Sequence, residues 1–113
     1  ITAPIARKDG STIEREINFK DGESAVTYYE RLAYKNGLSL VELHLGTGRT
    51  HQIRVHMKYI GHPLPGDFLY NPGSNKISRQ ALHSYQLEFT HPITGEHFLI
   101  QAPIPEDFSK AFQ

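Results

Sequence analysis

The sequence predicts an α+β fold in which one central helix packs on a largely antiparallel or mixed sheet. Two stretches rich in β-forming residues, 25–34 and 38–45, are separated by a short turn signal. Apolar residues then recur at helical spacing over 51–60, and two further β-rich stretches follow at 84–90 and 97–101. Because strands and helices do not alternate regularly, a parallel βαβ sheet is not expected. No Gly-, Ser- or Pro-rich run divides the 113 residues, so we expect one folded unit.

The strands are predicted from alternating side chains and turn signals. Residues 12–19 alternate imperfectly between apolar and charged residues, which indicates a short edge strand. Lys35-Asn36-Gly37 contains Asn-Gly, the strongest short hairpin signal, so 25–34 and 38–45 are predicted to pair. Apolar side chains occupy both alternating faces of 38–45. Both faces are therefore expected to be at least partly buried, and another element should cover the sheet.

The central helix is predicted over residues 51–60. Its apolar stripe consists of Ile53, Met57 and Ile60. Thr50 is the expected N-cap, and Gly61 followed by Pro63 is a helix-stop signal. The stripe should lie on the sheet.

The second half of the chain is predicted to contain a loop, a hairpin and a terminal helix. Residues 66–78, with Asn71-Pro72-Gly73, indicate an exposed loop. The strands at 84–90 and 97–101 should be joined by a turn at 91–95. Residues 105–112 are expected to form a short helix, with Phe108 and Phe112 at i and i+4.

Composition describes an ordinary globular chain, with 12 basic and 12 acidic residues. The basic residues are unevenly placed, because residues 43–87 hold five of them against Asp67, a local charge of +4. This could be an anion-binding surface or solvated surface charge. The absence of cysteine excludes disulfides and fits a cytoplasmic protein. No signal peptide and no apolar run of about 20 residues occur, so no membrane association is expected.

The junction between the second strand and the helix is the most informative segment. Gly46 and Gly48 allow a tight turn into a helix N-terminus, which presents free N–H groups to an anion. Arg49 precedes the helix, His51 and Gln52 lie in its first turn, and Arg54 shares a face with His51. These side chains could form an anion site, a buried ion pair, or a surface helix whose arginines pair with nearby acids.

Other site chemistries have little support in the sequence. His51 and His56 are five residues apart, about 140° around a helix, so they should point apart and no metal site is expected. No nucleophile elbow, complete dinucleotide loop or P-loop occurs. Aromatic residues, Tyr70 or Tyr85 above all, could stack on nucleic-acid bases, although strand aromatics more often belong to the core.

Several blocks of the chain resemble the RluA-type RNA pseudouridine synthases. Residues 48–57, 61–63 and 66–70 are similar to the late motif of that family. Residues 81–84 resemble its next block, and 101–103 resemble its ending. The resemblance covers essentially the whole chain. Pro65 departs from the aliphatic residue usual before Gly-Asp, which affects the expected path of that loop.

The resemblance implies an isomerase that converts uridine in RNA to pseudouridine, flips the target base, and needs no cofactor or metal. In that family an aspartate in a His-Arg-Leu-Asp motif performs the covalent step, and the chain lacks this motif. We therefore expect residues 1–113 to be the C-terminal portion of the catalytic domain, inactive alone. Arg54 matches the family's basic partner of that aspartate, and Leu82 matches an apolar pocket wall. The residues expected to contact RNA are Arg49, Thr50, His51, Gln52 and Lys58.

The implied partners are RNA, either rRNA or tRNA, and the missing N-terminal half of the same domain. An incomplete sheet also predicts self-association through exposed edge strands. Two alternatives remain open at this stage. The chain could be a stand-alone RNA-binding module, or a structural fragment that only pairs with its other half.

Overall fold

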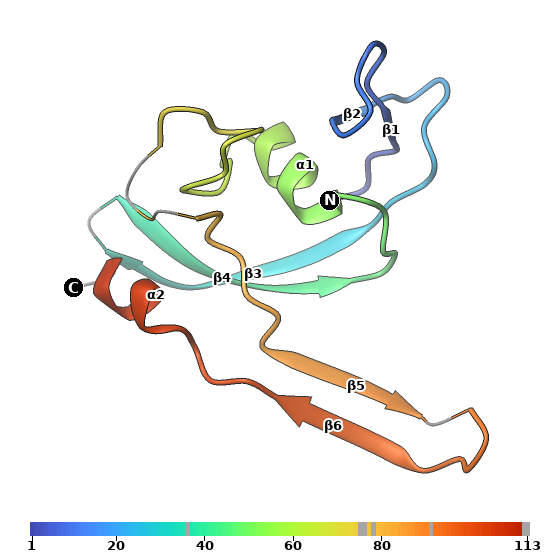
Figure 1. Ribbon diagram of the computed structural model, residues 1–113, viewed down its shortest axis with the longest axis vertical. Coiled ribbons are helices and arrows are strands. Elements are labelled where there is room, and N and C mark those ends of the chain that lie inside the picture. The colour runs from blue at the N-terminus through green and yellow to red at the C-terminus, as the bar shows by residue number, and fades with distance from the viewer. Residues whose placement is uncertain (36, 75–76, 78, 91, 112–113) are drawn as a thin grey trace.

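The computed structural model describes residues 1–35, 37–74, 77, 79–90 and 92–111 (Figure 1). The elements are β1 (Ile5–Arg7), β2 (Arg15–Ile17), β3 (Thr27–Lys35), β4 (Leu38–Leu45), α1 (Gln52–Tyr59), β5 (Gln86–Thr90), β6 (His97–Gln101) and α2 (Glu106–Ala111). The strands pair as β1–β2, β3–β4 and β5–β6, all antiparallel. The predicted α+β class is confirmed, although the described strands form three two-stranded sheets instead of one continuous sheet.

The β1–β2 pair contains the predicted edge strand, which is shorter than expected. Strand β2 covers only Arg15–Ile17 of the predicted 12–19, with Ile17 opposite Ile5. Side chains bend the chain on both sides of it. The Ser11 hydroxyl accepts a hydrogen bond from the Glu14 N–H at 2.9 Å, and Asn18 accepts two from the following turn. These local bonds compete with strand pairing and limit β2 to three residues.

The β3–β4 hairpin is confirmed, with Thr27 opposite Leu45 at one end and Lys35 opposite Leu38 at the other. Gly37 has φ +77°, a left-handed conformation that favours glycine, while Asn36 lies outside the described residues. Within β4, two residues on each face are half-buried, as predicted. These are Leu38, Leu40, Val41 and Leu43. Every residue of β3 after Thr27 is exposed, so the described elements cover only part of the hairpin.

Helix α1 begins one residue later than predicted and uses another N-cap. His51 is the N-cap, in a left-handed conformation with φ +56°, and Thr50 does not have this role. The Gln52 side chain holds the strand-to-helix junction together. Its Oε1 accepts hydrogen bonds from the Arg49 N–H at 2.9 Å and from the Thr47 hydroxyl at 2.7 Å. The predicted stop is confirmed, since Gly61 has φ +88° and its N–H bonds to the Lys58 carbonyl.

A line of buried hydrogen bonds fastens α1 to β3 and to the N-terminal segment. Gln52 Nε2 donates to the Thr27 hydroxyl, and that hydroxyl bonds to His56 Nδ1 at 2.8 Å. His56 Nε2 lies 2.8 Å from the Ala3 carbonyl oxygen, so it must carry the proton, and Nδ1 is the acceptor. His56 and Thr27 are both fully buried. The small apolar cluster beside them consists of Ile5, Ala25, Val55 and Tyr70.

The predicted exposed loop at 66–78 is instead partly built into the core. Asp67, Tyr70 and Ile77 are buried. Gly66, at φ +75°, lies so close to the Arg79 and Ile77 carbonyls that a Cβ would clash with them. The backbone also passes beside Pro65, whose carbonyl accepts the Ala81 N–H at 2.8 Å. The prediction of an exposed loop was wrong because turn-forming residues report backbone bends, not solvent exposure.

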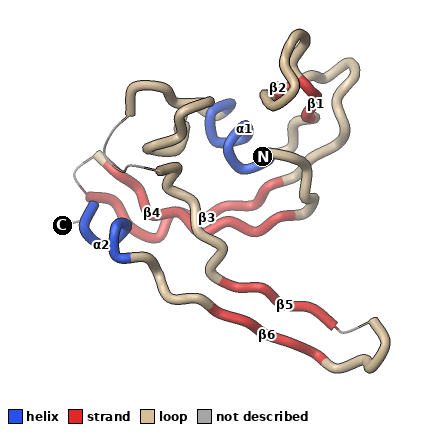
Figure 2. Tube along the Cα trace, in the orientation of Figure 1, coloured by secondary structure: helices blue, strands red, loops and turns tan. Residues whose placement is uncertain are grey.

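The β5–β6 hairpin extends away from the rest of the chain (Figure 2). Its strands agree with those predicted, except that β5 begins at Gln86 and not at 84. Helix α2 returns toward the body, where Asp107 pairs with Arg79 and Phe108 lies edge-on to His83. Phe112, the second aromatic of the predicted helical pair, lies outside the described residues. The described helices are all too short to cross a membrane.

The buried His56 should make stability depend on pH. Burial lowers the pKa of His56 below 6.5, so the unfolded chain binds a proton at higher pH than the folded chain. The stabilisation that neutral His56 gives the folded chain is therefore fully present above about pH 6.5 and is lost as the pH falls below that value. We expect His56→Gln to flatten the fall in unfolding free energy between pH 7.5 and 5, measured by urea denaturation. His62→Gln, at an exposed position, is the matched control and should leave the slope unchanged.

Candidate functional site

A buried ion pair between Arg54 and Asp67 lies at the centre of the candidate site. The pair is side-on and bidentate, with Nε–Oδ2 and Nη2–Oδ1 distances of 2.8 Å. Arg54 is 8% exposed and Asp67 is 0% exposed. Burial alone would raise the pKa of Asp67. The hydrogen bonds from Arg54 and from the Tyr70 N–H outweigh it and hold that pKa below its usual value. The carboxylate therefore stays ionised at neutral pH.

The remaining nitrogen of Arg54, Nη1, has no hydrogen-bond partner among the described residues. No described side-chain nitrogen or oxygen is both fully buried and unpaired. Nη1 must therefore reach solvent, which agrees with the 10% accessibility of the Arg54 side chain. The guanidinium is held on one edge and presents the other nitrogen at the surface.

Tyr70 organises the cations around it. The Arg54 guanidinium carbon lies 4.9 Å from its ring centroid, and Lys58 Nζ lies 5.9 Å from it. Its hydroxyl accepts the Arg15 backbone N–H at 2.9 Å and bonds to His51 Nδ1 at 2.8 Å. Tyr70 is only 3% exposed, so the suggestion that its ring stacks on a base was wrong.

His51 is neutral and presents an N–H group. Burial lowers the pKa of His51, and the nearby charges of Arg54 and Arg15 lower it further. Burial also raises the pKa of the Tyr70 hydroxyl, so that hydroxyl keeps its proton and can donate it to His51 Nδ1. In this tautomer Nε2 carries the imidazole proton. The left-handed backbone of His51, rare outside glycine, aims the ring at Tyr70.

The structure brings His51, Arg54 and Lys58 together on one face of α1. Arg49 is held elsewhere, with Nη1 2.9 Å from a Glu23 carboxylate oxygen and Nε bonded to the Ser24 carbonyl. Thr50 is exposed beside the junction. Arg49 and Arg54 each form an ion pair within the chain, with Glu23 and with Asp67, as two of the predicted alternatives allowed.

Gln52, which was expected to contact RNA, is buried instead. It is 3% exposed. Its side chain makes four hydrogen bonds, the full capacity of an amide, to Thr47 and Arg49 through Oε1 and to Val26 and Thr27 through Nε2. Its position in the first turn of α1 was predicted correctly, but the amide faces inward because it has to satisfy the buried strand-to-helix junction.

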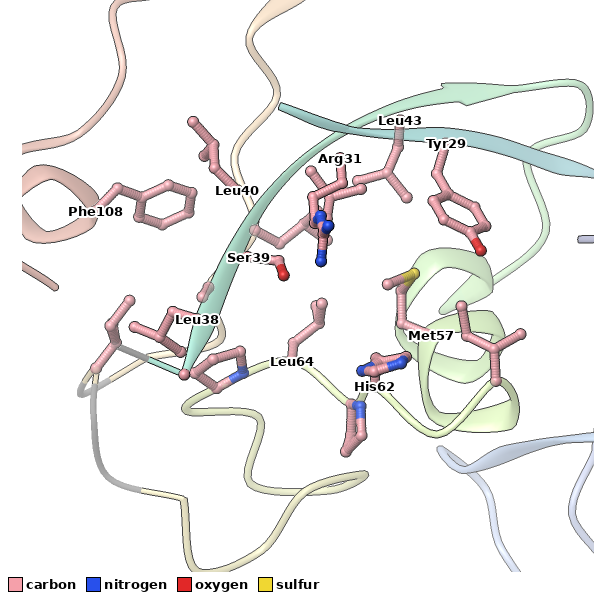
Figure 3. A pocket seen from close by; sticks show the side chains of 18 residues that line it. Tyr29, Arg31, Leu38, Ser39, Leu40, Leu43, Met57, His62, Leu64 and Phe108 are labelled. Atoms are coloured by element: carbon pink, nitrogen blue, oxygen red, sulfur yellow. The ribbon is translucent and has the colours of Figure 1, made fainter. Parts of the chain in front are cut away.

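Leu82, the predicted pocket wall, lies in the segment between α1 and β5. It lines a groove of about 450 Å³ between the β3–β4 hairpin, α1 and the loop that follows α1. Figure 3 shows Tyr29, Arg31, Met57 and Leu64 directed toward this space. Met57 and Ile60 of the predicted apolar stripe line it, while Arg54 is not among its described lining residues. The structure therefore does not bring the two residues expected at the reaction centre into one cavity.

Two contributors to the site were missed from the sequence. Asp67 belongs to the family block 66–70 and is the single acid in the basic stretch 43–87, and that isolation was the available signal that it pairs with one of the arginines. Arg15 gave no signal, because it contacts Tyr70 through its backbone across 55 residues. Among the described residues no group of three or more His, Cys, Asp or Glu could hold a metal ion.

Comparisons with known proteins relate the chain to one family. A family model described as RNA pseudouridylate synthase matches residues 1–59. The uncharacterized RNA pseudouridine synthase YjbO of Bacillus subtilis (strain 168) is 50% identical over 110 residues, covering 97% of this chain and 38% of that protein. The ribosomal large subunit pseudouridine synthase D of Nitrosomonas europaea is 38% identical over 122 residues, covering 100% of this chain and 35% of that protein.

A solved structure agrees with these sequence matches. The human RNA pseudouridylate synthase domain containing 1 superposes with a TM-score of 0.78 at 28% identity, over 91% of this chain and 46% of that one. The chain thus spans less than half the length of these relatives. The family model nevertheless matches just over half of the chain, and it includes the junction and α1. The chain belongs to the RNA pseudouridylate synthase family.

Proposed function

We propose that residues 1–113 form the C-terminal portion of the catalytic domain of an RNA pseudouridine synthase, whose catalytic aspartate is supplied by upstream polypeptide. The observation that carries this proposal is the Arg54 guanidinium, held on one edge by Asp67 with Nη1 at the surface. An arginine in this state can accept a second acid without leaving its first partner. Taken alone, the chain is expected to be inactive.

The reaction explains why such a cation is needed. The ribose C1′ exchanges its bond to uracil N1 for a bond to C5, while C5 loses a proton and N1 gains one. A carboxylate that acts covalently must be ionised in a partly dry pocket, where desolvation alone would raise its pKa. A fixed guanidinium opposes that rise. Asp67 offsets part of the Arg54 charge, so Lys58 and Arg15 add to the positive potential there.

RNA is the proposed substrate, and rRNA or tRNA the proposed class. Support comes from the basic face of α1, where Lys58 Nζ and the neutral His51 N–H lie beside Arg54 and are available to phosphate or base oxygens. Arg49 and Thr50 flank this face at the junction. Leu82 is proposed as an apolar wall of the base pocket, which the upstream polypeptide would complete. A cytoplasmic site of rRNA modification is consistent with this proposal.

A tritium-release assay on RNA labelled at uridine C5 tests the activity. We expect no turnover from the 113-residue chain. We expect turnover from a chimera in which the chain replaces the matching 38% of Bacillus subtilis YjbO, because that protein supplies the remaining polypeptide. The natural YjbO protein, assayed on the same total RNA, is the positive control.

Two outcomes would contradict the proposal. Turnover by the isolated chain would show that no upstream aspartate is needed. A chimera that folds, by circular dichroism and thermal melting, but stays inactive while YjbO is active would show that these residues cannot support the reaction.

An RNA-binding module without catalysis is the second candidate, favoured by the same basic face. If the isolated chain binds single-stranded RNA, the affinity should fall with salt, with a slope of about −0.7 per phosphate contact. Lys58→Gln should then reduce the magnitude of the slope by about 0.7, measured by fluorescence anisotropy. Lys35→Gln is the matched control, since this residue is exposed and lies outside α1. A salt-independent affinity would contradict this candidate.

Self-association of the isolated chain is also proposed, since β3 is exposed after Thr27 and large apolar side chains such as Tyr34 and Leu45 are more than half exposed. Sedimentation velocity should show dimers or larger species whose share grows with concentration. Addition of the separately expressed upstream part of YjbO should reduce that share. A strictly monomeric chain at high concentration would refute it.

A further inference from the structure

We propose that Asp67 is a positioning residue for the isomerisation, which sets the direction in which Arg54 presents Nη1. This inference deepens the proposed function and rests on it. Asp67 lies 13 residues after Arg54, in the segment between α1 and β5, and it is fully buried. It touches neither RNA nor the reacting atoms in this proposal and acts only through the guanidinium.

Asp67 is the fixed member of the pair because its own loop holds it. Its Oδ1 accepts the Leu69 and Tyr70 backbone N–H groups, each at 3.1 Å, in addition to Arg54 Nη2. The loop is fixed in turn by Gly66, which packs against the Arg79 and Ile77 backbone where no larger residue fits. The loop therefore fixes the orientation of the carboxylate independently of Arg54. The arginine side chain, which has many rotamers, adopts the one that fits this carboxylate.

The planar guanidinium transfers this orientation to Nη1. With Nε and Nη2 bound side-on to the carboxylate, Nη1 must lie in the same plane on the far side. Tyr70 places its ring 4.9 Å from the guanidinium carbon, and Phe68 places its ring at 5.8 Å. Both aromatic residues belong to the same loop as Asp67. One short segment, 66–70, thus determines both the plane of the guanidinium and its rotation within that plane.

Asp67→Asn tests the inference on the chain itself. The amide is almost isosteric and keeps an oxygen for the backbone N–H groups, but its NH₂ faces a nitrogen donor of Arg54 and its negative charge is lost. By heteronuclear NMR, the Arg54 Nε–H of the natural chain should exchange slowly with solvent. In the variant it should exchange at the rate of an exposed arginine. An unchanged Arg54 signal would overturn the inference.

Turnover in the YjbO chimera tests the consequence for the reaction. We expect Asp67→Asn to lower kcat by about 100-fold, the loss typical of a misplacement of about 1 Å, with KM for RNA changed less than threefold. If Arg54 is misplaced, the upstream aspartate loses its fixed cation and its pKa rises, so the acid limb of the pH–rate profile should shift to higher pH. Loss of the Asp67 charge alone, with Arg54 still in place, would shift this limb to lower pH instead. A simple loss of folded protein would reduce the rate without moving this limb.

Two further variants of Asp67 distinguish the effect of the carboxylate's position from the effects of its charge and of misfolding. Asp67→Glu keeps the charge but moves it by one methylene, so it should lose kcat as Asp67→Asn does. Asp67→Ser can still accept a backbone N–H, as in an ST turn, and serves if the asparagine variant unfolds. Asp107→Asn, which breaks the half-exposed Arg79–Asp107 pair, is the matched control and should keep full kcat.

The outcomes distinguish this inference from the proposed function. Full kcat in Asp67→Asn or Asp67→Glu, with Arg54 released in the NMR experiment, would overturn the positioning role. If the unsubstituted chimera is inactive while YjbO is active, the proposed function fails, and the positioning role fails with it even if the NMR result stands.

Discussion

The buried contact between Arg54 and Asp67 is the interaction on which the candidate site depends. Two opposite charges can leave water only if each is paired and hydrogen-bonded, and removal of one partner from such a pair typically costs about 3–5 kcal/mol. Here the carboxylate has two backbone N–H donors as well as the guanidinium. The contact joins α1 to the loop 66–70, and it therefore also places Tyr70. Without the Arg54–Asp67 contact, Tyr70 would not be held beside Arg54 and Lys58.

Helix α1 is only eight residues long, yet each of its faces makes a different kind of contact. Gln52 and His56 point inward and carry the hydrogen bonds to Thr27 and Ala3, while Met57 faces the apolar groove. His51, Arg54 and Lys58 form the basic face. The inward polar groups are fully satisfied, which is the condition for burying them. These hydrogen bonds hold the helix that carries the basic face against β3 and the N-terminal segment.

The net charge of zero conceals this arrangement. Several basic residues are neutralised where they stand, Arg49 by Glu23 and Arg79 by Asp107. Lys58 and the outer nitrogen of Arg54 remain available near Tyr70. A short, focused cationic face of this kind suits the gripping of a few phosphates or one carboxylate, whereas a broad electrostatic footprint on a long duplex calls for a more basic surface.

The sequence alone was sufficient for the features that depend on local chemistry. Asn36-Gly37 predicted the β3–β4 hairpin because the dipeptide favours the backbone of a tight turn, and Gly61 with Pro63 predicted the end of α1 because neither residue continues a helix. The blocks from 48 to 84 were long enough to indicate the family, which is confirmed by the family model that matches residues 1–59 of this chain and by the relatives that match nearly all of it. Tertiary structure decided the rest. Whether Gln52 faces RNA or the core, whether 66–78 is exposed, and which acid holds Arg54 all depend on contacts between residues distant in the chain. Spacing along a sequence carries no record of such contacts, since burial and pairing are properties of the packed whole.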